Sequence, residues 1–275
     1  KEGIKPIFVF DGVRPELKHQ EVQKRLAVKK EAEKLYQEAL SKEDIEGMKK
    51  YASRTTKLTN EMIDDSKELL TLLGIPIIQA PSEGEAQAAY LTQTGEAYAV
   101  ASQDYDSLLY NTTYLIQNLS IAGRRKKHRS LGTVVVKPTI IDLKRNLDNL
   151  EITREQLIAL AMLIGTDYNP GGIKGIGPKN ALKLVKKHGI DFDALFEEVK
   201  WKEHFEFSWK EVFVLFTELP VKKGYTIKFG KIMKEELIKF LVKDRDFRLE
   251  RVEKTINDLE KKKEELSQKS LDGFL

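Results

Sequence analysis

The sequence contains no cysteine among its 275 residues. This excludes a thiol nucleophile, zinc held by thiolates, an iron–sulfur cluster and a disulfide framework, and it favours a reducing, intracellular compartment. No apolar run approaches the roughly 18 residues that a membrane-spanning helix needs. The first residues also lack the apolar stretch of a signal peptide. We therefore expect no membrane partner.

The chain also lacks a large excess of charge of one sign. Its 47 Lys and Arg residues stand against 43 Asp and Glu residues, a formal net charge of +4. Any binding to nucleic acid must therefore come from local clusters of basic residues. The length suffices for one large domain or two small ones, with a core that needs no metal or disulfide to stabilise it.

Four apolar segments are each followed by acidic residues. The first three are short and β-rich and are followed by amphipathic helices, which is the pattern of a parallel α/β sheet. The fourth, residues 156–164, is helical. Sites in parallel sheets form beyond the carboxyl ends of the strands, so we expect the acids to gather there. They are Asp11, Glu83, Glu85, Asp104, Asp106 and Asp167.

A carboxylate cluster without His or Cys is typical of a site for hard divalent cations. Like charges repel unless cations neutralise them, and Mg²⁺ or Mn²⁺ prefers oxygen ligands. Two such ions can clamp the attacking and leaving oxygens of a phosphodiester. Structural alternatives exist for single acids, because Ser82 and Glu85 fit a capping box, Asp11 fits a turn and Asp167 fits a loop. However, acids recur after each of the successive apolar segments, and this recurrence favours the metal site over the separate structural roles.

A Gly-rich turn precedes a basic helix in the second half of the chain. The free N–H groups at a helix N-terminus, with lysines nearby, form a seat for phosphates. We therefore predict a helix–hairpin–helix that binds the DNA backbone, and the alternative is a helical hairpin with a solvated basic face. The residues concerned are Gly175, Ile176, Gly177, Lys179 and Lys183.

Two other segments are rich in charge. Residues 16–62 contain 20 charged residues among 47, which predicts exposed helices with little core. Residues 124–129 read Arg-Arg-Lys-Lys-His-Arg and lie between the apolar runs 114–119 and 133–136. We predict a basic loop on a β-hairpin, which either contacts phosphates or is a solvated tip.

The last residues combine a polar stretch with a short apolar motif. The apolar stripe of residues 246–259 stops at Lys261, so a flexible tail is expected over 261–275. Gln268, Leu271 and Phe274 follow at i, i+3 and i+6, and one 3₁₀ turn would place Leu271 and Phe274 on one side. This indicates a docking peptide, and a frayed chain end is the alternative.

Together these blocks resemble the flap endonuclease family of structure-specific 5′-nucleases, within the XPG-like group. The resemblance extends over nearly the whole chain. It implies a parallel-sheet, PIN-like nuclease core over 1–150 with a helical arch at 16–62, through which a 5′ single strand passes. It also implies a helical region over 151–260 with the helix–hairpin–helix at 165–188. The blocks are Val9–Gly12, Ala80–Ala86, Ser102–Asp106, Gly165–Tyr168 and Gly175–Lys179.

The resemblance also implies roles for single residues. The six acids would hold two Mg²⁺ ions, for which Mn²⁺ substitutes, and Lys18 and Arg25 would act on the scissile phosphate from the base of the arch. The helix–hairpin–helix binds duplex DNA, in relatives together with a K⁺ ion. The tail is similar to the box Gln-x-x-Leu-x-x-aromatic-aromatic that binds the sliding clamp PCNA, with Leu275 where the second aromatic is usual.

The implied activity is 5′-flap endonuclease, with 5′–3′ exonuclease activity, on flap, nicked or gapped DNA in replication and repair. A related gap or junction nuclease and a non-catalytic, clamp-bound DNA-binding protein are the alternatives. The nuclease is expected to be monomeric. It would be cytoplasmic and nucleoid-associated in an archaeon, which the short tail favours, or nuclear in a eukaryote. The family also begins with a further strand that carries another catalytic Asp, and nothing in this sequence matches either of them.

Overall fold

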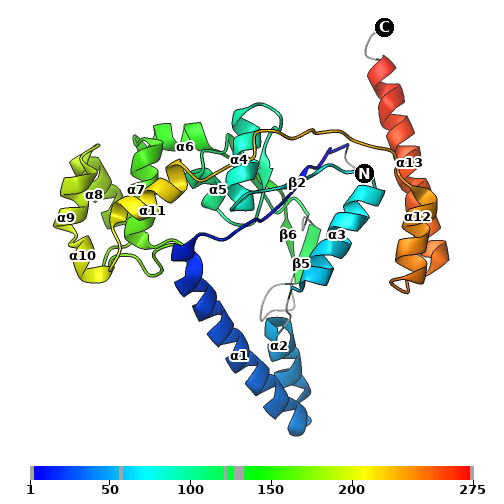
Figure 1. Cartoon of the computed structure of the whole chain (residues 1–275), viewed down its shortest axis with the longest axis horizontal. Helices are drawn as coiled ribbons and strands as arrows, with labels where there is room; N and C mark the ends of the chain where they lie inside the picture. Colours follow the sequence, from blue (N-terminus) through cyan, green and yellow to red (C-terminus); the bar gives the residue numbers. More distant parts are fainter. Residues whose placement is uncertain (1–2, 56–57, 121–122, 127–132, 273–275) are drawn as a thin grey trace. The chain divides into compact units, whose positions relative to one another are not determined.

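The computed structural model describes residues 3–55, 58–120, 123–126 and 133–272. The chain divides into a larger unit, residues 11–56 and 79–222, and a smaller unit, residues 1–10, 57–78 and 223–275. Figure 1 shows the elements along the chain. No helix among the described residues is both long enough and apolar enough to cross a membrane.

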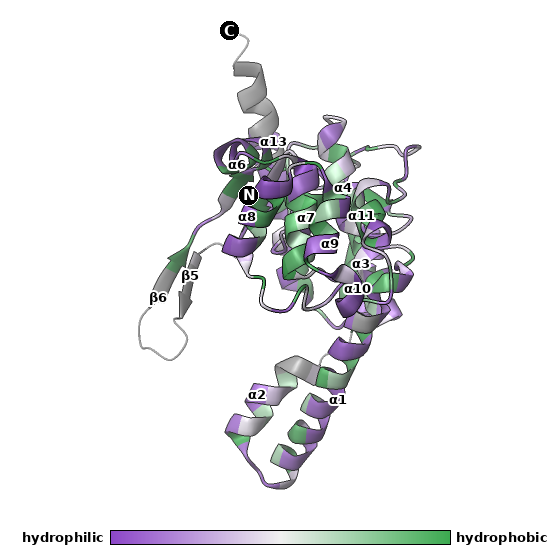
Figure 2. Cartoon of the chain, turned by 90° about the vertical axis from the view of Figure 1, so that its left-hand side faces the viewer, coloured by the Kyte–Doolittle hydropathy of each residue, from purple (hydrophilic) through white to green (hydrophobic). Residues whose placement is uncertain are grey.

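The larger unit begins with a helical hairpin of α1 (His19–Ser41) and α2 (Ile45–Thr55), preceded by the 3₁₀ turn Glu16–Lys18. The hairpin projects from the rest of this unit (Figures 1 and 2). Small residues line its interior, where Ala32 and Ala39 are buried. Leu26 and Val28 are exposed, so the hairpin has little core of its own.

A three-stranded sheet in the larger unit joins β3 (Val100–Ala101), β4 (Tyr114–Gln117) and β7 (Thr139–Asp142). β3 pairs with β4 in parallel, and β4 pairs with β7 antiparallel. The predicted α/β class is confirmed. The sequence placed the first three strands in one sheet, but in the described residues β1 (Phe8–Phe10) pairs with β2 (Ile77–Gln79) instead. Each described strand is only two to four residues long, so each pairing contributes few hydrogen bonds.

A β-hairpin lies between β4 and β7 in the sequence of the larger unit. β5 (Gly123–Lys126) pairs antiparallel with β6 (Thr133–Val136). The basic run therefore starts within a strand instead of a loop, because residues 114–117 pair with β7 and leave residues 123–126 to form the hairpin. Its remaining part, residues 127–129, lies outside the described residues.

Several helices of the larger unit lie around α7 (Arg154–Ile164), whose apolar surface lies in their middle (Figure 2). Ile158, Ala159, Met162 and Leu163 of α7 are fully buried. A capping box on Thr153 begins this helix. The other helices in this part of the unit are α4 (Gly84–Gln93), α5 (Asp106–Leu109), α6 (Leu143–Leu150), α8 (Pro178–His188), α9 (Phe192–Glu198), α10 (Trp201–His204) and α11 (Trp209–Thr217).

The smaller unit packs α3 (Asn60–Leu72), α12 (Lys234–Ile238), the π-helical turn Lys239–Lys243 and α13 (Leu249–Asp272). Leu72, Leu237, Phe240, Val252 and Ile256 form its apolar cluster.

Helix α13 differs from the sequence prediction. It continues to Asp272, although a flexible tail was expected from Lys261. Lys and Glu have high helix propensity and pair along a helix, as Lys262 and Glu265 do at 3.0 Å, so this stretch needs no apolar stripe to be helical. Gln268 and Leu271 thus lie in an α-helix instead of a 3₁₀ turn, and Phe274 and Leu275 lie outside the described residues.

Candidate active site

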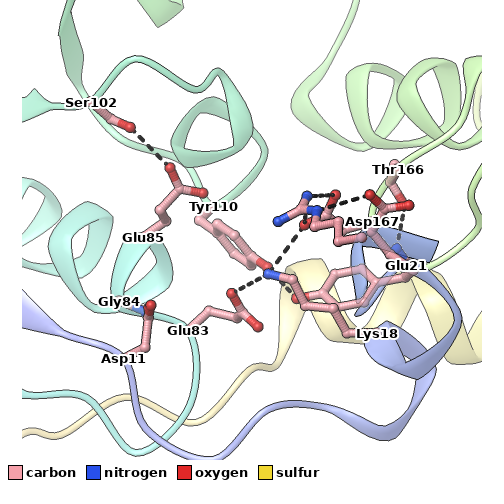
Figure 3. Close-up of polar contacts among 12 residues, drawn as sticks. Asp11, Lys18, Glu21, Glu83, Gly84, Glu85, Ser102, Tyr110, Thr166 and Asp167 are labelled. Atoms are coloured by element: carbon pink, nitrogen blue, oxygen red, sulfur yellow. Dashed lines mark hydrogen bonds and ion pairs between the residues drawn. The ribbon is translucent and has the colours of Figure 1, made fainter. Parts of the chain in front are cut away.

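Lys18 joins two acids that are distant in the sequence. Its Nζ lies 2.7 Å from Oε2 of Glu83 and 3.2 Å from Oδ2 of Asp167 (Figure 3). Burial opposes its positive charge, but the hydrogen bond and charge of Glu83, together with Asp167, raise the pKa of Lys18 overall. Lys18 therefore stays an ammonium group between two carboxylates.

Arg25 contacts the same acid from two turns further along the chain. Its Nη2 lies 3.1 Å and 3.3 Å from the two carboxylate oxygens of Asp167. Its Nε donates to Glu21 at 2.9 Å, which orients the guanidinium. The spacing of seven residues places Lys18 and Arg25 on one side of the helical segment. Both cations at the base of the hairpin thus face Asp167.

Asp11 caps α4 from outside the helix. Its Oδ1 accepts a hydrogen bond of 2.7 Å from the N–H of Gly84, the first residue of α4. This satisfies a free N–H group and places negative charge at the helix N-terminus. The backbone here is closely packed, because a Cβ on Gly12 would lie 2.2 Å from the carbonyl oxygen of Ala80. The turn alternative for Asp11 is thus replaced by a cap, and the Glu83 carboxylate is left to bind Lys18.

The capping-box alternative for Glu85 is wrong. The Ser82 hydroxyl donates to the carbonyl of Val13 at 2.9 Å and does not cap α4. Glu85 instead accepts a hydrogen bond of 3.1 Å from the hydroxyl of Ser102, just after β3 (Figure 3). Glu85 therefore belongs to the acidic cluster instead of the helix cap.

The remaining acids are close enough to oppose one another's charge. Burial, followed by the charge of Asp106, raises the pKa of Glu85 to about 7, with a smaller contribution from Asp104. Burial and the charge of Asp167 likewise raise the pKa of Asp106. Carboxylates that are buried and repel one another are stabilised by added positive charge.

The structure places all the predicted acids in the larger unit and joins Glu83 and Asp167 through Lys18. Within the described residues, no three acidic or histidine side chains are arranged to hold one metal ion. The ionic contacts of Lys18 and Arg25 supply positive charge there. The role of the acids as metal ligands stays a prediction.

The loop that carries Asp167 is held by contacts that the sequence analysis missed. Asn169 is fully buried, donates to the carbonyl of Met162 at 2.7 Å and accepts from the Thr166 hydroxyl at 2.6 Å. Gly165 has φ +119°, a value that favours glycine. The loop is thus fixed to the end of α7, and the only available signal was the position of Asn169 next to the acidic block.

Two tyrosines beside the acids were also missed. The hydroxyl oxygens of Tyr110 and Tyr168 lie 2.6 Å apart. Burial, with the nearby negative charges of Glu83 and Asp106, raises the pKa of both hydroxyls. Tyr168 directly follows Asp167, but nothing in the sequence linked it to Tyr110, 58 residues earlier.

The Gly-rich turn leads into α8 as predicted. Gly175 has φ +87°, whereas Gly177 is extended and serves as the N-cap before Pro178. Lys179 and Lys183 are exposed, and among the described residues no carboxylate pairs with either. The next lysines on the helix are neutralised, since Lys186 pairs with Glu151 at 2.8 Å and Lys187 pairs with Glu198 at 2.6 Å.

The fold and these acid-bearing segments define a nuclease of the XPG class. Residues 1–32 match the XPG N-terminal domain and residues 74–167 match the XPG I-region. Flap endonuclease 1 of Staphylothermus marinus is 47% identical over 261 residues, which are 95% of this chain and 74% of that relative. The chain belongs to the flap endonuclease family of structure-specific nucleases, as the resemblance implied.

Solved structures agree with this assignment. Flap endonuclease-1 from Methanococcus jannaschii is 41% identical, with a TM-score of 0.67 over 93% of this chain and 75% of its own. The catalytic core of Rad2 in complex with DNA substrate has a TM-score of 0.63 at 24% identity, over 94% of this chain and 79% of its own. At that identity the likeness shows the fold alone.

Proposed function

We propose that this chain hydrolyses phosphodiesters of DNA at the point where a 5′ single-stranded flap leaves a duplex, in replication and repair. Membership of the flap endonuclease family supports the substrate. The observation that carries the proposal is the contact of Lys18 and Arg25, at the base of the α1–α2 hairpin, with the acids Glu83 and Asp167. This contact brings the cations proposed to bind the phosphate close to acids proposed to hold the metal ions.

The acids suit Mg²⁺ as the cofactor. They offer only carboxylate oxygens, the ligands that Mg²⁺ and Mn²⁺ prefer. Burial and mutual repulsion, which together raise the pKa of Glu85 and Asp106, favour a bound cation. The chemistry that two such ions supply is Lewis acidity at the attacking and leaving oxygens. The residues that would hold them are Glu83, Glu85, Asp104, Asp106 and Asp167, with Asp11 next to Gly84.

Lys18 and Arg25 would bind the scissile phosphate. In the described structure they neutralise Glu83 and Asp167. A phosphate beside these acids would offer the same two cations oxygen atoms of higher charge as the transition state forms. Glu21 keeps the Arg25 guanidinium in place, so that its planar group can bind two oxygens.

A labelled 5′-flap duplex tests the proposal directly. We expect the chain to cut the flap strand at the junction when Mg²⁺ is added and to leave it intact in EDTA. A blunt duplex and a four-way junction serve as controls for substrate choice. Preferred cutting of the four-way junction would support the junction-nuclease alternative. Binding of the flap without any cutting in Mg²⁺ or Mn²⁺ would support the non-catalytic one.

We further propose that α8 binds the duplex backbone. Lys179 is the second residue of α8 and Lys183 lies one turn later, and both side chains are exposed. An added Cβ on Gly175 or Gly177 would meet nothing within 4 Å, so the turn is open on its outer side. A phosphate can therefore approach the backbone closely. A K⁺ ion at this turn stays a prediction.

Replacing Lys179 and Lys183 by Gln is expected to weaken DNA binding equally for all sequences. Two lost phosphate contacts should reduce the slope of log K against log salt by about 2. Fluorescence anisotropy at several salt concentrations measures this slope. Lys186→Gln is the matched control, because Glu151 already neutralises Lys186. An unchanged slope in the double variant would favour the solvated helical hairpin.

The sliding clamp PCNA is the proposed protein partner. Gln268 and Leu271 lie near the end of α13, and Phe274 follows them in the sequence. We expect Phe274→Ala to weaken clamp binding about thirtyfold, since truncating a buried aromatic anchor commonly costs about 2 kcal/mol or more. Calorimetry against the matching clamp measures this, with flap cleavage by the same variant, clamp omitted, as the control. Equal affinity of variant and parent would show that the end of the chain does not dock.

A further inference from the structure

Two catalytic segments of the larger unit meet through a pair of tyrosines. Asp106 is the first residue of α5, and Tyr110 follows at its end, one turn later. Asp167 and Tyr168 are neighbours on the loop after α7. The two tyrosine hydroxyls lie 2.6 Å apart, and both residues are buried, at 7% and 2% exposure. Figure 3 shows Tyr110 among the acids and Lys18.

The rings of both tyrosines also pack on one partner. The Tyr110 ring lies 5.4 Å from the ring of Phe216 in a tilted arrangement, and the Tyr168 ring lies 5.1 Å from it edge-on. Phe216 belongs to α11 in the core of the larger unit. This ring packing does not need the hydroxyls, so replacement of tyrosine by phenylalanine separates packing from hydrogen bonding.

Other contacts hold each of the two segments to α7. Asn169 and Thr166 fix the loop to α7, and Arg154 donates to the carbonyl of Leu109 at the end of α5. Among the described residues, the Tyr110–Tyr168 bond is the one hydrogen bond between α5 and the loop of residues 165–170. This bond therefore adds a direct polar link to the contacts that both segments make with α7 and Phe216.

We propose that Tyr110 and Tyr168 are positioning residues for the nuclease reaction, whose hydroxyl pair sets the placement of Asp106 relative to Asp167. The inference rests on the proposed function, in which both acids hold cations. The two carboxylates carry like charges and therefore repel each other. A short neutral bond one residue from Asp167 and one turn from Asp106 resists that repulsion. Small displacements of positioned groups can cost about a hundredfold in rate, so this restraint matters for turnover.

Three variants test the proposal: Tyr110→Phe, Tyr168→Phe and the double replacement. Each single variant leaves one buried hydroxyl without its partner, whereas the double variant leaves none and keeps both rings. Thermal stability should therefore fall in the single variants and recover in the double variant. Single-turnover flap cleavage should stay about tenfold slower in all three, with DNA affinity within about twofold of the parent. Calorimetry should show Mn²⁺ binding to the double variant weakened by at least about threefold.

A control variant separates positioning from stability. Leu195→Ala removes a fully buried side chain from α9 in the same core, without touching the tyrosines. Below its melting temperature it should cleave and bind Mn²⁺ like the parent, despite its lower stability. A double variant with the parent's cleavage rate and Mn²⁺ affinity would overturn the proposal. If the parent itself cuts no flap, the proposed function fails, and the Mn²⁺ affinities alone then decide whether the pair positions the acids.

Discussion

Asp104→Asn is expected to slow flap cleavage about a thousandfold or more while DNA affinity stays within a few-fold of the parent. A cation at a phosphoryl centre supplies several kcal/mol of charge stabilisation, and each 1.36 kcal/mol corresponds to a tenfold change in rate. Asp104 is exposed, and its carboxylate accepts no hydrogen bond among the described residues. The replacement therefore removes charge without removing a structural contact. Single-turnover cleavage and anisotropy on the same flap substrate measure the two quantities.

Asp148→Asn is the matched control for this variant. Asp148 is an exposed carboxylate of α6 in the same unit, and the replacement makes the same change of charge. It should leave both cleavage and binding unchanged. If Asp104→Asn cuts the flap at the parent's rate, the acidic cluster does not perform the metal chemistry proposed for it.

Lys18→Met should lower the single-turnover rate by about a hundredfold to a thousandfold, the usual effect of removing one preorganised charge at a reacting centre. Methionine retains much of the apolar stem of the side chain, so packing is largely preserved, whereas Glu83 and Asp167 lose a shared cation. The rate is measured at saturating flap DNA and Mg²⁺, which separates chemistry from binding.

Lys24→Met provides the comparison on the same helix. Lys24 is exposed on α1, and among the described residues it makes no ion pair. It should leave the rate unchanged and alter only the salt dependence of binding. Equal rates for Lys18→Met and Lys24→Met would mean that Lys18 neutralises acids in the free protein but takes no part in the reaction.

The presence of all six acids in one unit was predictable because their positions follow from local sequence. Each acid comes directly after an apolar segment, and short segments of that kind end at the surface of a core. The sequence did not decide whether Glu85 is a metal ligand or part of a helix cap. Ser82 and Glu85 have the spacing of a capping box, yet their hydrogen bonds go to Val13 and Ser102, which only the tertiary fold brings near.

Other parts of the site could not be predicted for the same reason. The hydroxyl pair of Tyr110 and Tyr168 joins residues 58 positions apart, and no periodic pattern encodes such a contact.

The prediction for the end of α13 was wrong for a different reason. Apolar periodicity detects helices that pack on a core, whereas residues beyond Lys261 are helical through the intrinsic preference of Lys and Glu and through pairs along the helix.

The helical end of α13 changes how a partner at the end of the chain would be held. Ile256 is buried in the smaller unit, and Leu271 lies 15 residues further along the same helix. At 1.5 Å per residue this stretch spans about 22 Å. A helix of this composition acts as a semi-rigid spacer, whereas a coil of the same length would let its end fluctuate over a wide volume. A clamp bound at the end of the chain would thus stand at a nearly fixed distance from the smaller unit. Inserting one residue into the helix between Ile256 and Gln268 would rotate the bound clamp by about 100° around the helix axis.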